Sequence, residues 1–435
     1  MPDRILHRLV IRDVAGGAVF VVRDGSGWRL PSLRLEDQHT AVVEHVNAAV
    51  AARWGLATTV LRGLAHIESA DGAVRAHVLE MQADSGRRTA DSAWLPVETD
   101  LVHALPRGDA ALVRGALADS GEADGCDWAR PGWWPEVRAW IEAEVGAADV
   151  VQLRAWQSSC VARVRATDTT VYYFKALPLS AAKEARVTEY LSRHAAPGAP
   201  AVVAADLERR WLLMRGFAGV SLDDSRDLAF WERGLSFYAQ LQAATWNSAA
   251  ELRALGCGER TPNALAAAVD PLLADTAALM PAHPQGLTQA QVEELRRRAP
   301  QLERDCFELA GIGLPPALDH GDLWPSNILV NERACTIIDW EDAALALPFS
   351  SLAPFLTMVR EWNLRLELER VADVYLPALA AVQPHADLRH AFMLALPLAF
   401  FEMAVRYWRM PPEVVALHPW MREMVPLFLR RVLEP

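Results

Sequence analysis

Residues 318–330 read Leu-Asp-His-Gly-Asp-Leu-Trp-Pro-Ser-Asn-Ile-Leu-Val, and this stretch decides the class of fold. It carries a carboxylate, Asp322, and a carboxamide, Asn327, on one loop that runs into a short apolar strand. A second strand, at residues 336–338, ends directly on Asp339. We therefore expect Asp322, Asn327 and Asp339 at the ends of two paired strands. Oxygen ligands of this kind suit Mg²⁺, which takes one or two carboxylates together with phosphate oxygens and water.

This pattern, His-Gly-Asp with Asn-Ile-Leu after four residues and then Ile-Asp-Trp at 338–340, resembles the aminoglycoside phosphotransferase and choline kinase family. Members of that family are relatives of the protein kinases. The resemblance implies an α+β fold with two protein-kinase-like lobes, a small β-rich N-lobe and a large helical C-lobe. It also implies that Asp322 orients the acceptor hydroxyl and takes its proton. Asn327 and Asp339 would hold Mg²⁺ against the phosphates of ATP, or of GTP.

A kinase also needs a lysine for the α- and β-phosphates and a helix glutamate that holds this lysine. Lys175 ends the apolar run 171–174, where a charge is otherwise out of place. Glu184 follows on the next expected helix, and Glu189 on the same helix is a competing partner. We expect the Lys175–Glu184 pair.

The rest of the nucleotide site is less typical of the family. The turn that would cover the phosphates contains Ser158 and Ser159 but no glycine, so hydroxyl and backbone N–H groups would cover them. The adenine is expected beside Met214 and Gly216, after the short strand that begins at Trp211. The family usually carries an Asp where this chain has Ser351, which predicts an altered contact to the catalytic loop.

The domain organisation follows from the changes of pattern along the chain. We expect an α+β accessory domain at 1–118, a linker at 119–149 and the kinase domain at 150–435, with the N-lobe at 150–216 and the C-lobe at 217–435. The expected elements include strands at 18–23 and 73–81, a helix at 39–54, a hairpin at 162–176 and a helix at 181–194. The pair Trp133-Trp134 is expected to dock the linker.

Residues 1–115 resemble a Nudix-type domain weakly, through a strand, a turn, Leu30-Pro31-Ser32 and a helix that ends at Gly55. The active Nudix helix carries clustered glutamates that bind metal, but here Glu44 stands alone. The resemblance therefore implies a degenerate domain without hydrolase chemistry. The alternative is an unrelated α+β domain that packs against the kinase lobe.

The acceptor is expected between the catalytic loop and the C-terminal helices. Candidate substrate residues are Glu341, Asp342, Trp362 and Glu402. An acidic and aromatic surface favours a cationic or sugar-like acceptor. The alternative is that the last helices are core and that Glu402 pairs with Arg406 four residues later.

Composition narrows the class further. The chain has 435 residues, 52% of them hydrophobic, and a net charge of −12, which disfavours partners such as nucleic acid or an anionic membrane. The five cysteines form no CxxC pair, so reduced thiols in a cytoplasmic protein are expected. The most apolar stretch, 391–401, is too short to span a bilayer. The oligomeric state stays open.

The sequence thus predicts a Mg·ATP-dependent phosphotransferase that acts on a hydroxyl of a small molecule. Three alternatives remain: a nucleotide-binding regulatory module of the pseudokinase type, a kinase that phosphorylates a protein, and a first domain that hydrolyses nucleotides. The acceptor could be an aminoglycoside, a sugar, an amino alcohol or an amino-acid derivative.

Overall fold

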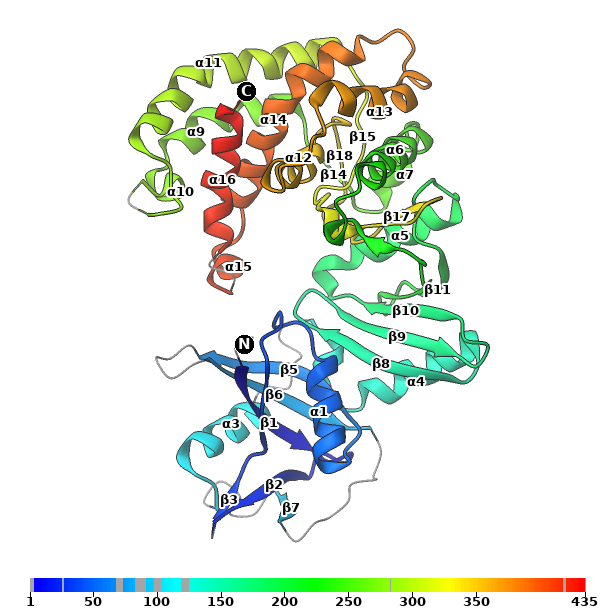
Figure 1. The fold of residues 1–435 in the computed structure, drawn as a ribbon, viewed down its shortest axis with the longest axis vertical. Helices are drawn as coiled ribbons and strands as arrows, with labels where there is room; N and C mark the ends of the chain where they lie inside the picture. Colours follow the sequence, from blue (N-terminus) through cyan, green and yellow to red (C-terminus); the bar gives the residue numbers. More distant parts are fainter. Residues whose placement is uncertain are drawn as a thin grey trace. The chain divides into compact units, whose positions relative to one another are not determined.

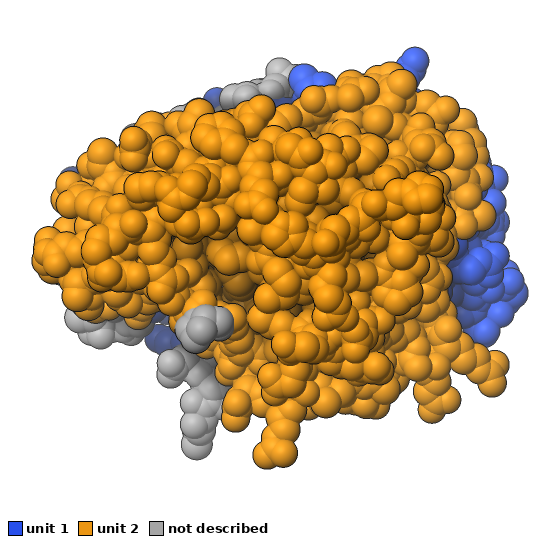
Figure 2. Space-filling view, turned by 90° about the horizontal axis from the view of Figure 1, so that it is seen from above, with its two compact units in different colours: residues 1–185, 201–216 blue, residues 186–200, 217–435 orange. Residues whose placement is uncertain are grey.

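The computed structural model describes residues 4–25, 27–67, 73–82, 91–97, 104–118, 125–281, 283–417 and 420–434. The chain divides into two units, which Figure 2 shows in different colours. The first unit contains residues 1–185 and 201–216, and the second contains residues 186–200 and 217–435. The division at 216/217 falls at the predicted end of the N-lobe, and residues 186–200 belong to the second unit.

The N-terminal part of the first unit is a mixed sheet with the strand order β3-β2-β1-β6-β5, in which β4 also pairs with β1 and β7 with β2. Strands β1 and β6 run parallel. The strands are β1 (Arg4–Arg12), β2 (Ala18–Asp24), β3 (Gly27–Arg29), β4 (Ser32–Glu36), β5 (Thr58–Ile67), β6 (Val74–Met81) and β7 (Ser92–Pro96).

Helices α1 (Glu44–Trp54) and α3 (Arg107–Ala118) lie on opposite faces of this sheet (Figure 1). Successive side chains of a strand point to opposite faces, so Leu9 packs with Val46 of α1, whereas Val10 packs with Val113 of α3. The smaller α+β domain is therefore confirmed as a fold class, and its resemblance to a Nudix domain stays a prediction.

The predicted start of the first helix at His39 was wrong, because α1 begins at Glu44. Residues 41–43 use their backbone differently. The Val43 N–H donates to the Leu153 carbonyl at 2.9 Å, and the Ala155 N–H donates to the Ala41 carbonyl at 3.0 Å. Apolar spacing alone does not reveal such a pairing, since both partners are far apart in the sequence.

The N-lobe sheet is antiparallel, with the order β11-β12-β10-β9-β8. Its strands are β8 (Ala148–Ala155), β9 (Cys160–Ala166), β10 (Val171–Ala176), β11 (Val202–Asp206) and β12 (Trp211–Arg215), accompanied by α4 (Trp133–Val145) and α5 (Ala182–Arg193). Trp133 of α4 packs against Phe174 and Trp211 with ring centroids about 6 Å apart. The predicted docking of the Trp133-Trp134 pair is confirmed, since both side chains are buried in this cluster.

The second unit is mainly helical (Figure 1). Its helices are α6 (Leu228–Ala244), α7 (Ala249–Ala254), α8 (Pro262–Ala266), α9 (Val269–Ala274), α10 (Thr276–Leu279), α11 (Gln289–Ile312), α12 (Leu352–Glu361), α13 (Leu368–Ala380), α14 (Leu388–Trp408), α15 (Pro412–Leu417) and α16 (Met421–Leu433). Its short strands are β13 (Val220–Ser221), β14 (Gly258–Glu259), β15 (Ala317–Asp319), β16 (Ile328–Val330), β17 (Cys335–Ile337) and β18 (Ala344–Ala346). The 3₁₀ turns within the described residues are η2 (Asp127–Ala129) and η3 (Leu179–Ala181) in the first unit and η4 (Leu222–Asp224), η5 (Pro325–Asn327) and η6 (Trp340–Asp342) in the second.

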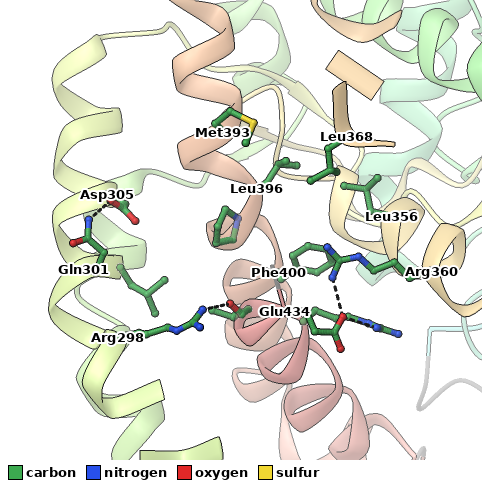
Figure 3. A pocket seen from close by; sticks show the side chains of 14 residues that line it. Arg298, Gln301, Asp305, Leu356, Arg360, Leu368, Met393, Leu396, Phe400 and Glu434 are labelled. Carbon is green, nitrogen blue, oxygen red and sulfur yellow. Dashed lines mark hydrogen bonds and ion pairs between the residues drawn. The ribbon is translucent and has the colours of Figure 1, made fainter. Parts of the chain in front are cut away.

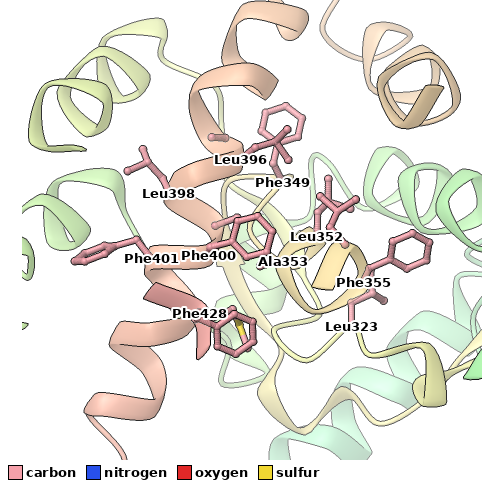
Figure 4. Packing of buried hydrophobic residues seen from close by; sticks show 14 of the residues in the cluster. Leu323, Phe349, Leu352, Ala353, Phe355, Leu396, Leu398, Phe400, Phe401 and Phe428 are labelled. Atoms are coloured by element: carbon pink, nitrogen blue, oxygen red, sulfur yellow. The ribbon is translucent and has the colours of Figure 1, made fainter. Parts of the chain in front are cut away.

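Among the described residues, α14 is the one helix that could cross a membrane by length and composition, but 67% of its most apolar window is buried inside the second unit. Phe400 and Phe401 of α14 belong to the same buried cluster as Leu352 of α12 and Phe428 of α16 (Figure 4). Leu323, the neighbour of Asp322 in the chain, is fully buried in this cluster too (Figure 4). The helical core therefore anchors the loop that carries Asp322.

Candidate active site

A short antiparallel hairpin brings two of the predicted metal ligands to one end. Strands β16 and β17 pair with Ile328 opposite Ile337, so Asn327 precedes one strand where Asp339 follows the other. The Ile338 N–H donates to the Asn327 carbonyl at 2.9 Å. Asp339 has φ +71°, in the left-handed region that non-glycine residues rarely adopt. Such strain persists where the surrounding structure enforces it, and it is common at functional sites.

Asp322 and Asn327 are in direct contact. The Asn327 Nδ2 donates to the Asp322 carbonyl oxygen at 2.9 Å and lies 3.4 Å from its carboxylate Oδ2. Burial, with the nearby Asp342 carboxylate as the next cause, raises the pKa of Asp322 to about 7, while Arg406 acts in the opposite direction. A carboxylate with a pKa near 7 is suited to accept a proton at neutral pH.

His320 fixes the backbone of this loop. Its ring is fully buried, and Nε2 lies 2.9 Å from the Ile338 carbonyl oxygen, which makes Nε2 the protonated nitrogen. Nδ1 then accepts the Asp322 N–H at 3.2 Å. Burial lowers the pKa of His320, which favours this neutral tautomer. The histidine of the motif is therefore a structural link between the loop and the strand that leads to Asp339.

Ser351 holds the loop from the other side. The Gly321 N–H donates to Ser351 Oγ at 2.6 Å, and the Ser351 N–H donates to Asp319 Oδ1 at 3.0 Å. Asp319 is fully buried and also forms an ion pair with Arg260 at 3.1 Å. The departure from the family pattern at Ser351 therefore leaves a contact to the catalytic loop, made by a hydroxyl group.

The first unit contains the predicted lysine pair. Lys175 Nζ lies 2.5 Å from Glu184 Oε1, and the Glu184 side chain is only 2% exposed. The competing candidate, Glu189, instead pairs with Arg193 one helical turn later. Lys175 lies on β10 between Phe174 and Ala176, which face the buried cluster, so its own side chain leaves from the opposite face of the sheet.

The other predicted nucleotide residues lie at strand ends of the same unit. Ser158 and Ser159 are half-buried in the turn between β8 and β9, which the Trp156 N–H closes by donating to the Ser159 carbonyl at 2.9 Å. Met214 is half-buried near the end of β12. The Gly216 N–H donates to the Val171 carbonyl at 2.8 Å, so this backbone donor is used within the sheet.

Two of the four predicted substrate residues line one cavity of about 320 Å³ in the second unit. They are Asp342 and Glu402, which share this cavity with Arg260 and Arg406. Glu341 is exposed on η6 and does not line the cavity. Trp362 lies elsewhere, stacked under the Arg226 guanidinium at 3.2 Å and against Trp231.

Arginines neutralise the acidic groups of this cavity. Arg406 Nη2 lies 2.9 Å from Asp342 Oδ2, whereas Glu402 Oε2 accepts the Ser350 hydroxyl at 2.7 Å. The suggested Glu402–Arg406 pair is thus replaced by Asp342–Arg406. Burial raises the pKa of Glu402, which weakens its charge further. The expected acidic surface is therefore a mixed one. Sequence reasoning missed Arg260, which no local pattern connects to the catalytic loop.

A second cavity of the same unit, about 290 Å³, is lined by residues of α11, α12, α13, α14 and α16 (Figure 3). Its apolar wall includes Leu396 and Phe400. The Glu434 carboxylate binds Arg360 at 2.8 Å and Arg431 at 2.7 Å. None of the predicted site residues lines it.

Comparison with known proteins identifies the chain. A loop with a half-buried aspartate, beside a hairpin with two predicted oxygen ligands, is the arrangement expected of a kinase-type phosphotransferase. The sequence model of the phosphotransferase enzyme family matches residues 146–385, more than half of the chain. The chain therefore belongs to this family of phosphotransferases. The predicted family and kinase-like fold class are therefore confirmed. No curated protein matches the chain.

Solved structures with detectable similarity include three small-molecule kinases. A macrolide 2'-phosphotransferase from Brachybacterium faecium is 21% identical to this protein, with a TM-score of 0.43. The aligned region covers 68% of this chain and 97% of the chain of that phosphotransferase. A putative fructosamine-3-kinase from Thermobifida fusca is 22% identical with a TM-score of 0.42, covering 69% and 99%. A choline kinase from Cryptosporidium parvum is 12% identical with a TM-score of 0.47, covering 69% and 94%. The family assignment rests on the family model.

Proposed function

We propose that this protein transfers the γ-phosphoryl group of ATP, in the presence of Mg²⁺, to a hydroxyl group of a small molecule in the cytoplasm. The observation that carries the proposal is Asp322. It is held by His320 and Asn327 at the edge of a rigid core, and its pKa of about 7 suits proton acceptance at neutral pH.

In the proposed reaction, the acceptor oxygen attacks the γ-phosphorus, its proton passes to the Asp322 carboxylate, and the bond to the leaving ADP oxygen breaks. Phosphoryl transfer depends on positioning and charge neutralisation more than on covalent catalysis, so few side chains suffice. Asp322 therefore has to be ionised before the reaction and close to the acceptor hydroxyl.

The residues present fit a Mg²⁺-nucleotide. Asn327 uses its amide Nδ2 as a donor to Asp322, which leaves its carboxamide oxygen for a cation, and Asp339 lies at the same end of the hairpin. Mg²⁺, when bound there, would neutralise phosphate charge. Lys175, held by Glu184, would bind the α- and β-phosphates, while Ser158 and Ser159 would cover them.

For the acceptor, the cavity beside Asp342 supports a polar molecule with several hydrogen-bonding groups. It offers both arginine donors and carboxylate acceptors, as a sugar or amino alcohol requires. Glu341 and Trp362 stay candidates for the acceptor side without a contact to this cavity.

The test is a transfer assay with γ-labelled ATP, Mg²⁺ and a pooled panel of aminoglycosides, sugars and amino alcohols, read by mass spectrometry. We expect a phosphorylated product from the intact protein, none from Asp322→Ala, and an unchanged amount from Asp373→Ala. Asp373 is the matched control, because its carboxylate is exposed and pairs with Arg389.

Turnover by Asp322→Ala equal to that of the intact protein would refute the proposal. Binding of Mg·ATP without any product, even with a broad panel, would support the alternative of a nucleotide-binding regulatory module. The glycine-free turn at Ser158 and Ser159 is the feature that favours this second candidate.

A further inference from the structure

The turn between β8 and β9 is short and contains no glycine, so its backbone has less conformational freedom than a glycine-rich loop. Ala155 and Cys160 form the last strand pair, and the Trp156 N–H closes the turn on the Ser159 carbonyl at 2.9 Å. Only Gln157 and Ser158 lie between these two hydrogen-bonded residues, and neither is glycine. A turn this short moves mainly with its strands, so the position of β8 decides where the turn lies.

Strand β8 is the edge of the N-lobe sheet, and an edge strand has backbone N–H and C=O groups that stay unpaired within the sheet unless another segment covers them. Here residues of the N-terminal domain cover it. The Val43 N–H donates to the Leu153 carbonyl, and the Ala155 N–H donates to the Ala41 carbonyl, at 2.9 and 3.0 Å. Residues 41–43 therefore act as one more short strand, paired with the last residues before the turn.

Two side chains also contact the turn itself. The His39 ring lies against Trp156 with centroids 5.7 Å apart, and His39 Nδ1 accepts the Ala41 N–H at 3.2 Å, which orients the ring. The Cys126 thiol donates to the Gln157 carbonyl oxygen at 3.3 Å. Neither His39 nor Cys126 belongs to the N-lobe sheet.

A buried polar contact secures the N-terminal domain in this position. Gln152 of β8 is 3% exposed and forms paired hydrogen bonds with the Val60 backbone of β5, since Nε2 donates to its carbonyl and Oε1 accepts its N–H, both at 2.8 Å. Oε1 also accepts Asn47 Nδ2 at 3.1 Å. Buried hydrogen bonds of this kind hold a single register, because any slip leaves polar groups unsatisfied.

We propose that segments preceding the N-lobe are part of the nucleotide site: residues 39–43 of the N-terminal domain, together with Cys126 of the linker, position the turn Trp156–Ser159, which would cover the phosphates. His39 is then a positioning residue, which acts on the nucleotide through Trp156 and the turn. In this proposal, contacts from the N-terminal domain and the linker fix the conformation of the turn Trp156–Ser159 before the nucleotide binds. This inference rests on the proposed function, since it requires that the turn bind phosphates.

The test measures Mg·ATP binding by calorimetry and transfer kinetics in the full chain. His39→Ala removes the ring contact, and its side chain is exposed, so the fold tolerates the change. We expect a dissociation constant for Mg·ATP that is about 3–10-fold higher, the factor that corresponds to one aromatic contact. At saturating ATP, kcat should change less than twofold, because the chemical step is untouched. His39→Phe, which keeps a ring against Trp156, should restore binding.

Two further variants separate positioning from general destabilisation. Cys126→Ala should weaken Mg·ATP binding in the same direction, and hydrogen exchange of peptide 154–161 should be faster in both alanine variants. Glu44→Gln is the matched control: it breaks the ion pair with Arg163, 2.9 Å long, which joins the same two parts of the chain away from the turn.

The outcomes distinguish the two proposals. Equal Mg·ATP affinity in wild type, His39→Ala and Cys126→Ala would overturn the positioning role and leave the proposed function intact. An equal loss of affinity in Glu44→Gln would also overturn it, because the effect would then come from domain stability. Absence of Mg·ATP binding in the wild type would overturn the proposed function and, with it, this inference.

Discussion

Replacement of Asp322 by asparagine should stabilise the protein while it abolishes transfer. The pKa of Asp322 rises from 3.8 to about 7, with burial as the main cause, so the folded protein keeps this group ionised only at a cost. The difference of about three pKa units corresponds to about 4 kcal/mol. Because the side chain is partly exposed, solvent screening reduces this value, and we expect about 2 kcal/mol.

The sign of the pH dependence follows from linkage. A carboxyl group whose pKa is raised on folding binds more protons in the folded than in the unfolded state between pH 4 and pH 7. The free energy of unfolding of the wild type therefore falls as the pH rises through this window, and it levels off above pH 7. Asp322→Asn has no carboxyl group at this position, so its free energy of unfolding does not fall for this reason as the pH rises. Its advantage over the wild type should be small near pH 4 and reach about 2 kcal/mol at pH 8.

Urea unfolding of both proteins at pH 4.5, 6 and 8, followed by circular dichroism, measures this advantage. The carboxamide oxygen of the variant can still accept the Asn327 amide, so the local contact is kept. Asp373→Asn is the control, because its carboxylate is exposed and lacks the burial penalty. A difference that does not grow with pH, or a variant that becomes less stable than the wild type at pH 8, would refute the reasoning.

Three other perturbations test the site. Arg406→Met removes a cation that lowers the pKa of Asp322, so the acid limb of the pH profile of kcat should move to higher pH. At pH 7, kcat should be lower by about fivefold. An acid limb that moves to lower pH would contradict the role of Asp322 as the proton acceptor. Ser351→Ala leaves the buried N–H of Gly321 without its hydroxyl acceptor and should lower the free energy of unfolding by about 1–3 kcal/mol in urea titrations. Ser351→Thr keeps a hydroxyl group and should retain most of the wild-type stability. Gly219→Ala would place a Cβ 2.4 Å from a backbone carbonyl oxygen of β16, which cannot move aside, so a loss of at least about 1–3 kcal/mol is expected in the same measurement; unchanged stability would show that the loop yields easily.

The sequence alone determined the parts whose chemistry is local. The His-Gly-Asp loop, the Asn five residues after Asp322 and the Asp that ends the next strand are close along the chain, so a short hairpin is enough to bring them to one end, although the loop is also held by distant residues such as Ser351. The Lys175–Glu184 pair was predicted from the resemblance to kinases and the order of strand and helix, with Glu189 as the competing partner; the structure pairs Lys175 with Glu184 and Glu189 with Arg193.

Only the tertiary structure decided which partner each charge finds. Arg260 meets Asp319 across 59 positions of sequence, and Arg406 takes Asp342 in preference to the nearby Glu402. Residues 39–43, whose apolar spacing predicts a helix, instead pair with β8. The physical reason is the same in each case. Buried charges and the backbone groups of edge strands need hydrogen-bonding partners, and the tertiary fold determines which groups are near enough to serve. The local spacing of residues therefore does not predict a partner that lies a hundred residues away.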